Sequence, residues 1–301
     1  MRILATAAWT LGLICLLVTP TLSAEPAEKS TKTLKALIVE GQNNHRVWPK
    51  TTQMMKSYLE ETGLFQVDVA TTKPGGKDDK FEPEFSKYDV VVSNYNGVPW
   101  PEGTQKAFED YMQGGGGFVV VHAANNSFPK WKAYNEMIGL GGWNRRDERS
   151  GPYVYYDGNN KLVRDKSKGK GGHHGSQHDF VVVVRDATHP VTKGMPNSWL
   201  HVKDELYDML RGPAKNMKVL ATAYADKSKG GSGRHEPMIF SLSYGKGRVF
   251  HTPMGHGLDS QSCVGFIVTL QRGAEWAATG KVTQDFPGDF PGVEKTSRRD
   301  K

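Results

Sequence analysis

The segment that most constrains the fold is GFVVVHAAN, which begins at Gly117 and is apolar almost without interruption up to His122. A strand with one face in water alternates apolar and polar residues, whereas a run of Phe and Val fits a strand buried on both faces. Such strands are typical of parallel sheets that carry helices on both sides. Glycines at 115–117 permit a tight turn into the strand. The chain is therefore predicted to be an α/β protein.

Strand-like and helix-like segments alternate along the rest of the chain, as a parallel sheet with crossover helices requires. The predicted fold has three layers, with a mostly parallel sheet and helices on both faces. No internal repeat of about 20 to 50 residues is present, which argues against propellers and solenoids. The predicted strands begin at Lys35, Phe65, Tyr88, Gly117, Asp179, Met217, Pro237 and Gly247, and the predicted helices span residues 47–62, 101–112, 130–139 and 264–277.

The alternation predicts one domain, residues 34–280, preceded by a polar leader at 25–33. Regular patterns lapse between residues 140 and 178, a stretch longer than the roughly 15 residues usual for loops in compact domains. We interpret this stretch as a loop insertion over the functional face. Residues 281–301, which contain Pro287 and Pro291, are predicted to form an extended C-terminal tail.

The first 24 residues have the three-part pattern of a secretory signal peptide: Arg2, an apolar run at 11–18, and small residues before a cleavage site. Cleavage is expected after Ser23 or Ala24. A membrane anchor is the alternative, but the apolar run is shorter than the roughly 20 residues that span a bilayer. We therefore expect export to the periplasm or the medium, without stable membrane insertion of the mature chain.

Charge and cysteine content argue against a nucleic-acid-binding protein and against a fold held by internal disulfides. The formal charge is +7, and much of the excess lies in loop residues 161–172 and in the C-terminal tail. A nucleic-acid interface needs a basic stripe with interleaved aromatic residues, which is not found, so no nucleic-acid partner is expected. Of two cysteines, Cys15 lies in the signal peptide. Cys263 is then alone, without a partner for an internal disulfide, and is interpreted as a small buried residue.

Four histidines follow predicted strands: His45, His122, His251 and His256. In open parallel sheets, ligands bind beyond the carboxyl ends of the strands. A single histidine at a strand end is more often a structural hydrogen-bonding group. When several histidines converge on one face of a sheet, a functional site and a structural role are equally favoured.

An acidic group lies in HVKDELYDML, which contains Asp204, Glu205 and Asp208. Carboxylates beside histidines can orient them, bind a metal with them or act as a general base. If the segment is helical, Asp204 and Asp208 share one face. A solvated helix start, which favours acidic residues, is the alternative.

The sequence GGHHGSQH holds His173, His174 and His178. Dense histidines raise the possibility of a zinc site, because imidazole suits that metal. Neither HExxH nor CxxC occurs, however, and the glycines favour a flexible loop.

Three motifs together resemble the ThuA-like (trehalose-utilisation) family, over about Leu34 to Thr279: GGGGFVVVHAAN, DATHPVTKGMP followed by DELYD, and PMIFSLSYGKGRVFHTPMGHG. The resemblance implies a flavodoxin-like fold similar to class I glutamine amidotransferases. In those enzymes the central strand leads to a nucleophilic cysteine, and His122 stands at that position here, so thiolate chemistry is not expected. The resemblance assigns the pocket to His45, His122, Asp204, Glu205, Tyr207 and His256.

The resemblance also implies action on disaccharides, glycosides or their 3-keto derivatives, with a small-molecule carbohydrate as the partner. The expected catalytic residues, which perform acid/base work, are His122, His256, Asp204 and Glu205. The expected substrate-binding residues are His45, Tyr207, Trp143, Arg145 and His251. The expected ligands of a divalent metal, Zn or Mn, are His45, His122 and His256.

Aromatic residues in the loops allow two interpretations, namely stacking on sugars or anchoring of the loops in the core. These residues are Trp100, Trp131, Trp143, Tyr153, Tyr155 and Tyr156. Two functional alternatives to the enzyme also stay open at this point. They are a non-catalytic sugar-binding module and an inactive scaffold related to the amidotransferases.

Overall fold

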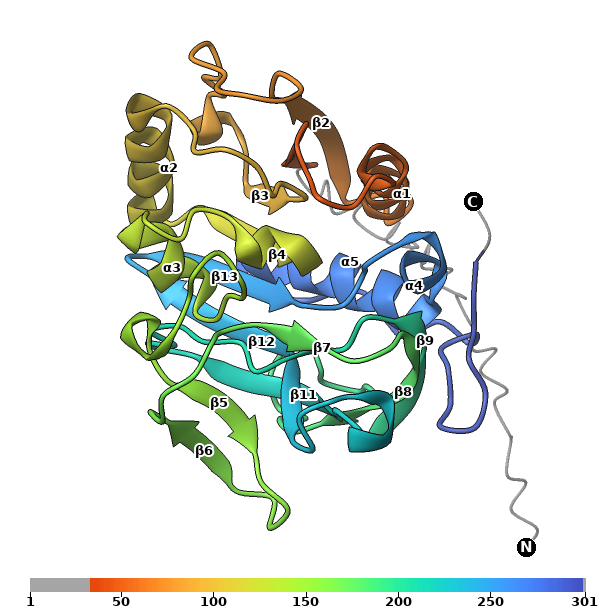
Figure 1. Ribbon diagram of the computed structural model, residues 1–301. Helices are drawn as coiled ribbons and strands as arrows, with labels where there is room; N and C mark the ends of the chain where they lie inside the picture. Colours follow the sequence, from red (N-terminus) through yellow and green to blue (C-terminus); the bar gives the residue numbers. More distant parts are fainter. Residues whose placement is uncertain (1–32, 300–301) are drawn as a thin grey trace, which may run out of the picture. The chain divides into compact units, whose positions relative to one another are not determined.

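Strand β4 (Gly117–Val121) is buried on both faces, as its apolar sequence predicts. Val119 and Val121 belong to a first hydrophobic cluster, whereas Phe118 and Val120 belong to a second. Because successive side chains of a strand point to opposite faces, the sheet needs a covering layer on each side. The predicted three-layer α/β fold is confirmed in the computed structural model, which describes residues 33–299 (Figure 1).

The main sheet has the strand order β2-β1-β3-β4-β13-β12-β11-β8-β9. Its strands are β1 (Leu34–Glu40), β2 (Phe65–Thr71), β3 (Val90–Ser93), β4, β8 (His178–Val184), β9 (Ser198–Asp204), β11 (Lys218–Tyr224), β12 (His235–Tyr244) and β13 (Gly247–Thr252). The pairs β1–β2, β1–β3, β3–β4 and β4–β13 are parallel, and the pairs from β13 to β9 are antiparallel. The carboxyl ends of the parallel strands therefore lie at one edge of the sheet.

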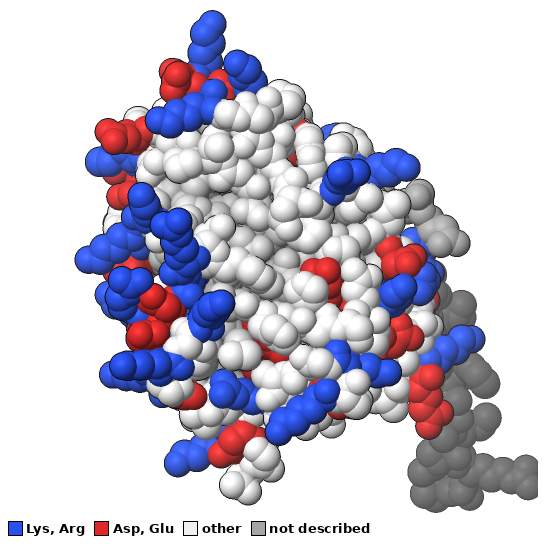
Figure 2. Space-filling view, in the orientation of Figure 1, with Lys and Arg blue, Asp and Glu red and all other residues white. Residues whose placement is uncertain are grey.

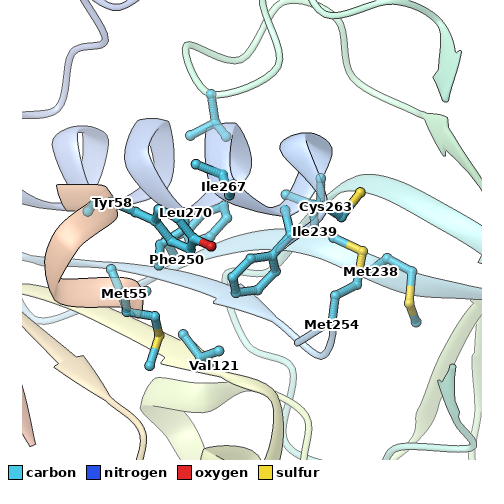
Figure 3. Close-up of a cluster of buried hydrophobic side chains, with 14 of the residues drawn as sticks. Met55, Tyr58, Val121, Met238, Ile239, Phe250, Met254, Cys263, Ile267 and Leu270 are labelled. Atoms are coloured by element: carbon cyan, nitrogen blue, oxygen red, sulfur yellow. The ribbon is translucent and has the colours of Figure 1, made fainter. Parts of the chain in front are cut away.

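Helices cover the two faces of the sheet. α1 (Trp48–Glu60) and α5 (Val264–Thr279) contribute to the first hydrophobic cluster, and α2 (Glu102–Gly114) and α3 (Lys132–Ile138) contribute to the second. Figure 3 shows part of the first cluster, where Tyr58 of α1 and Leu270 of α5 lie beside Phe250 of β13. A short helix, α4 (Leu258–Ser262), precedes α5.

Two segments differ from the sequence-based expectation. Residues 140–178 contain the antiparallel hairpin β5 (Tyr153–Tyr156) and β6 (Leu162–Asp165), so the prediction of an irregular stretch is wrong there. The acidic segment is not helical, because β9 ends at Asp204 and the short strand β10 (Tyr207–Asp208) pairs with β7 (His173–His174). Strands β5, β6, β7 and β10 have only two to four residues each, too few for a periodic pattern to show in the sequence.

Residues 281–299 form no helix and no strand beyond an isolated β-bridge residue. Phe286 and Phe290 pack against the first hydrophobic cluster, and Arg298 forms a β-bridge with Cys263. Cys263 itself is buried and free. Among residues 33–299, no helix is long and apolar enough to cross a membrane. The predicted signal peptide and residues 25–32 of the leader lie outside the described residues.

Candidate active site

His122 lies where the central strand ends and a 3-10 turn, residues 122–126, begins. Its φ of 46° is in the left-handed region, an uncommon conformation for a residue with a side chain. Its Nδ1 donates a hydrogen bond of 2.6 Å to the carbonyl oxygen of Pro253. Since a carbonyl only accepts, Nδ1 carries a hydrogen, and Nε2 is the ring atom left to exchange a proton. That Nε2 is buried and has no hydrogen-bond partner among the described residues.

Glu205 is the carboxylate around which the histidines gather. Its oxygens lie 3.2 Å from Nε2 of His256, 3.7 Å from Nε2 of His122, 3.8 Å from Nε2 of His174 and 3.9 Å from Nε2 of His45. Burial by itself raises the pKa of this carboxyl, but the surrounding imidazoles, His122 first, outweigh burial and lower the pKa to about 2. Glu205 is therefore ionised at neutral pH.

His45 comes from the loop after β1 and is held by Asn43. The backbone N–H and the ring Nδ1 of His45 both contact Oδ1 of Asn43, at 2.9 and 3.1 Å. Burial, together with the neighbouring His122 and His256, lowers the pKa of His45 to about 3. The ring is thus neutral at pH 7, and its Nε2 faces Glu205.

His256 lies in the loop after β13, and a buried carboxylate fixes this loop. Asp204 accepts hydrogen bonds from the backbone N–H groups of Glu205, Gly255 and His256 at 2.7 to 3.0 Å. It also accepts one of 2.8 Å from Nε2 of His201. With both oxygens used in this way, Asp204 positions Glu205 and His256. Its predicted role in proton transfer to a substrate does not fit this arrangement.

His174 and Gln177 join the site, although the sequence analysis assigned them no role in it. The ring of His174 donates from Nδ1 to the carbonyl of Gly175 at 2.8 Å, so its Nε2 faces Glu205 in the same way as that of His122. The side-chain amide of Gln177 lies 3.4 Å from both Glu205 and His256. The motif GGHHGSQH was the available signal, and its strand pairing with β10 brings it to the site.

Aromatic rings form one wall beside these groups. The Tyr207 ring lies against His122, with 4.1 Å between centroids, and 4.6 Å from the ring of Trp143. Tyr207 is almost fully buried, whereas Trp143 is partly exposed. In the orientation of Figure 1, where β7 lies near the centre, charged side chains are sparse in the middle of the face and Lys and Arg gather along one side (Figure 2).

Other predicted residues lie apart from Glu205. His251 is fully buried, and its nitrogens contact the carbonyl of Ile138 and the side chain of Asn125, so its predicted contact with substrate is not supported. Arg145 is exposed and lines a different surface hollow with Pro129 and Lys130. The rings of Trp100 and Trp131 belong to the second hydrophobic cluster and anchor loops.

The donors suit a divalent metal ion. Ligand atoms of His45, Glu205 and His256 all lie within 4.8 Å of one another. Two neutral imidazoles and a carboxylate are a ligand set that binds Zn²⁺ in proteins and that Mn²⁺ also accepts. Metal-bound histidines commonly donate their second ring N–H to an oxygen, as Nδ1 of His45 does to Asn43.

Residues 35–277 match the ThuA family, whose description is trehalose utilisation. A solved ThuA-like protein from Parabacteroides merdae is 50% identical to this chain, and the match covers 89% of this chain and 98% of that protein, with a TM-score of 0.86. A ThuA-like protein from Bacteroides uniformis is 19% identical, with 86% and 97% covered and a TM-score of 0.54, which is a likeness of fold alone. No curated protein is significantly similar to the chain.

Proposed function

The chain belongs to the ThuA (trehalose utilisation) family, and from this membership and its site geometry we propose that it is an enzyme of carbohydrate metabolism. Its substrates are disaccharides, glycosides or their 3-keto derivatives. His45, His256 and Glu205, the last in place of the expected ligand His122, would hold a divalent metal ion, which would supply Lewis-acid polarisation of a sugar oxygen. His122 acts as the general base and returns the proton as the general acid.

One observation carries the proposal. His45, His122 and His174 each direct Nδ1 to an oxygen atom, so that three Nε2 atoms face one ionised carboxylate. When these rings are neutral, their Nε2 lone pairs face a negative charge, and a cation or a proton bound between them converts this repulsion into attraction. A purely structural cluster has no need of this arrangement, because a single donor hydrogen on each ring satisfies a carboxylate.

His122 has the features of a general base. Its proton on Nδ1 is held by Pro253, and its Nε2 is free to take a proton from a sugar hydroxyl or from a carbon next to a keto group. The sparse charge on the face in Figure 2 suits an uncharged ligand. The trehalose in the family's description supports a sugar as that ligand.

Turnover of trehalose and of 3-keto-trehalose, followed by mass spectrometry of the products, tests the proposal. The protein is assayed after loading with Zn²⁺ or Mn²⁺. His122→Asn should lower turnover by about 10²- to 10⁴-fold, because the amide hydrogen-bonds at similar size but cannot exchange a proton near neutral pH. Glu205→Gln should lower the bound metal as well. His235→Asn, which changes a histidine on β12 away from the site, is the control and should leave both unchanged.

Three outcomes contradict parts of the proposal. Sugar binding without conversion by the wild-type protein indicates a binding module. If the wild-type protein retains no metal after loading, the metal site is refuted and only acid/base catalysis by the histidines is left of the proposal. Unchanged turnover in a folded His122→Asn variant removes His122 from the catalytic residues.

A further inference from the structure

Three consecutive residues near the site have a left-handed backbone. Trp143, Asn144 and Arg145 have φ values of 51°, 47° and 64°. This conformation is tolerated by Asn but is costly for a bulky residue such as Trp. Strained backbone persists only where neighbouring contacts enforce it, and it concentrates at ligand-binding sites.

Hydrogen bonds on both sides hold the turn. The N–H of Arg146 donates to the carbonyl of Trp143 at 2.8 Å, and the N–H of Trp143 donates to the carbonyl of Gly171 at 2.7 Å. Arg146 is 3% exposed, and its guanidinium donates to the carbonyls of Asn126, Ser127 and Gly142 at 2.7 to 3.0 Å. Arg146 thus ties the turn to the segment that follows His122.

Gly172 allows β7 to pass directly against the indole. Its φ is 87°, and a Cβ atom there would lie 2.6 Å from the backbone nitrogen of Trp143 and 2.8 Å from Cε3 of its ring. Only glycine combines that backbone conformation with so close an approach. Gly172 of GGHHGSQH therefore serves the placement of Trp143.

The Trp143 ring stands one side chain away from the reacting groups. Its centroid is 4.6 Å from that of Tyr207 and 6.0 Å from that of His174, and Nε2 of His174 is 3.8 Å from Glu205. The indole is nevertheless only partly buried. Core packing does not require a strained backbone that leaves a large aromatic ring partly in solvent, whereas presentation of the ring to a ligand does.

We propose that the left-handed turn Trp143–Arg145 presents the Trp143 indole as a platform for the apolar C–H face of a pyranose ring whose reacting end lies at Glu205. This assignment rests on the proposed function, and it narrows the substrate class to cyclic sugars. An acyclic polyol offers the same hydroxyl groups without a flat C–H face. Discrimination between the two is therefore the property that Trp143 confers.

Affinities for trehalose, methyl α-glucoside and sorbitol, measured by calorimetry on the metal-loaded full chain, test the platform. Trp143→Ala should weaken binding of both cyclic sugars about tenfold, with Trp143→Phe intermediate, and should leave the weak binding of sorbitol unchanged. In turnover, KM should rise while kcat changes less. Tyr224→Ala removes another partly exposed aromatic ring, on β11, and is the matched control with no expected effect.

The outcomes separate this inference from the proposed function. Equal affinities of wild type and Trp143→Phe, together with retained affinity in Trp143→Ala, overturn the platform while leaving the enzyme in place. Sugar binding that depends on Trp143 without any turnover supports the platform and refutes catalysis. Failure of the wild-type protein to bind either cyclic sugar overturns both. If Trp143→Ala does not fold, the ratio of trehalose to sorbitol affinity in Trp143→Phe decides.

Discussion

At the scale of single residues, hydrogen bonds to backbone carbonyls decide what the histidines can do. Pro253 and Gly175 each accept from an Nδ1 atom, which leaves the Nε2 atoms of His122 and His174 directed at Glu205. The chemistry of the site therefore depends on main-chain atoms whose residue type is immaterial. In the pair His201 and Asp204, by contrast, the side chains themselves matter. Both are fully buried and hydrogen-bonded to each other, and Asp204 acts by holding the backbone of Glu205 and His256.

The buried carboxyl of Glu236 is expected to make the stability of the protein depend on pH. Its carboxyl is 2% exposed and accepts a 2.8 Å hydrogen bond from Ser232, and burial, with Asp208 nearby, raises its pKa from 4.5 to about 7. Between these values the folded protein keeps a proton that the unfolded chain has lost, so stability falls as pH rises from 4.5 to 7. The loss is on the order of 3 kcal/mol above pH 7.

Glu236→Gln removes this titration. The free energy of unfolding of this variant minus that of wild type, measured in urea, should increase by a few kcal/mol from pH 5 to pH 8. Glu294→Gln alters an exposed glutamate of the tail and should show no such trend. A constant difference between Glu236→Gln and wild type across this range would show that Glu236 titrates normally.

At the scale of elements, the end of β9 and the loop after β13 form one unit through Asp204. Four hydrogen bonds converge on its buried carboxylate, from His201 and from the backbone of residues 205, 255 and 256. An Asn side chain has one oxygen and would turn its NH₂ group towards donors. Breaking a buried charged network of this kind costs about 3–5 kcal/mol.

Asp204→Asn is therefore expected to lower the free energy of unfolding by about that amount and to reduce metal binding, since Glu205 and His256 lose their support. Asp259→Asn is the control, because this aspartate on α4 is largely exposed and pairs with Arg298 at the surface. Its substitution should change stability by less than about 1 kcal/mol. Equal urea midpoints for the two variants would contradict the role of Asp204.

At the scale of the whole molecule, export is the remaining proposal. The pattern of the first 24 residues predicts removal by a signal peptidase, which requires small side chains such as Ser23 and Ala24 before the cut. The intact mass of the protein from its native host should lack the first 23 or 24 residues. Full-length protein in the cytoplasm would contradict export.

Local sequence patterns determined much of the fold. The run at 117–121 required burial on both faces, and the helices at 48–60 and 264–279 were predicted to within a few residues. These elements were accessible because hydrophobic periodicity depends on neighbouring residues only. His45, His122 and His256 were found by the same logic, since carboxyl ends of parallel strands share one edge of a sheet.

Tertiary structure alone decided the rest. Strands β7 and β10 have two residues each and pair with each other across a long stretch of chain, whereas β5 and β6 form a local hairpin that meets β12. Pairing of β7 with β10 carried His174 to Glu205. Hydrogen bonds across the fold gave the neighbours Asp204 and Glu205 different surroundings, namely backbone N–H groups around Asp204 and imidazole rings around Glu205. Periodicity reports which face a residue takes within its own element. It carries no information on which partner, tens of residues away, will meet that face.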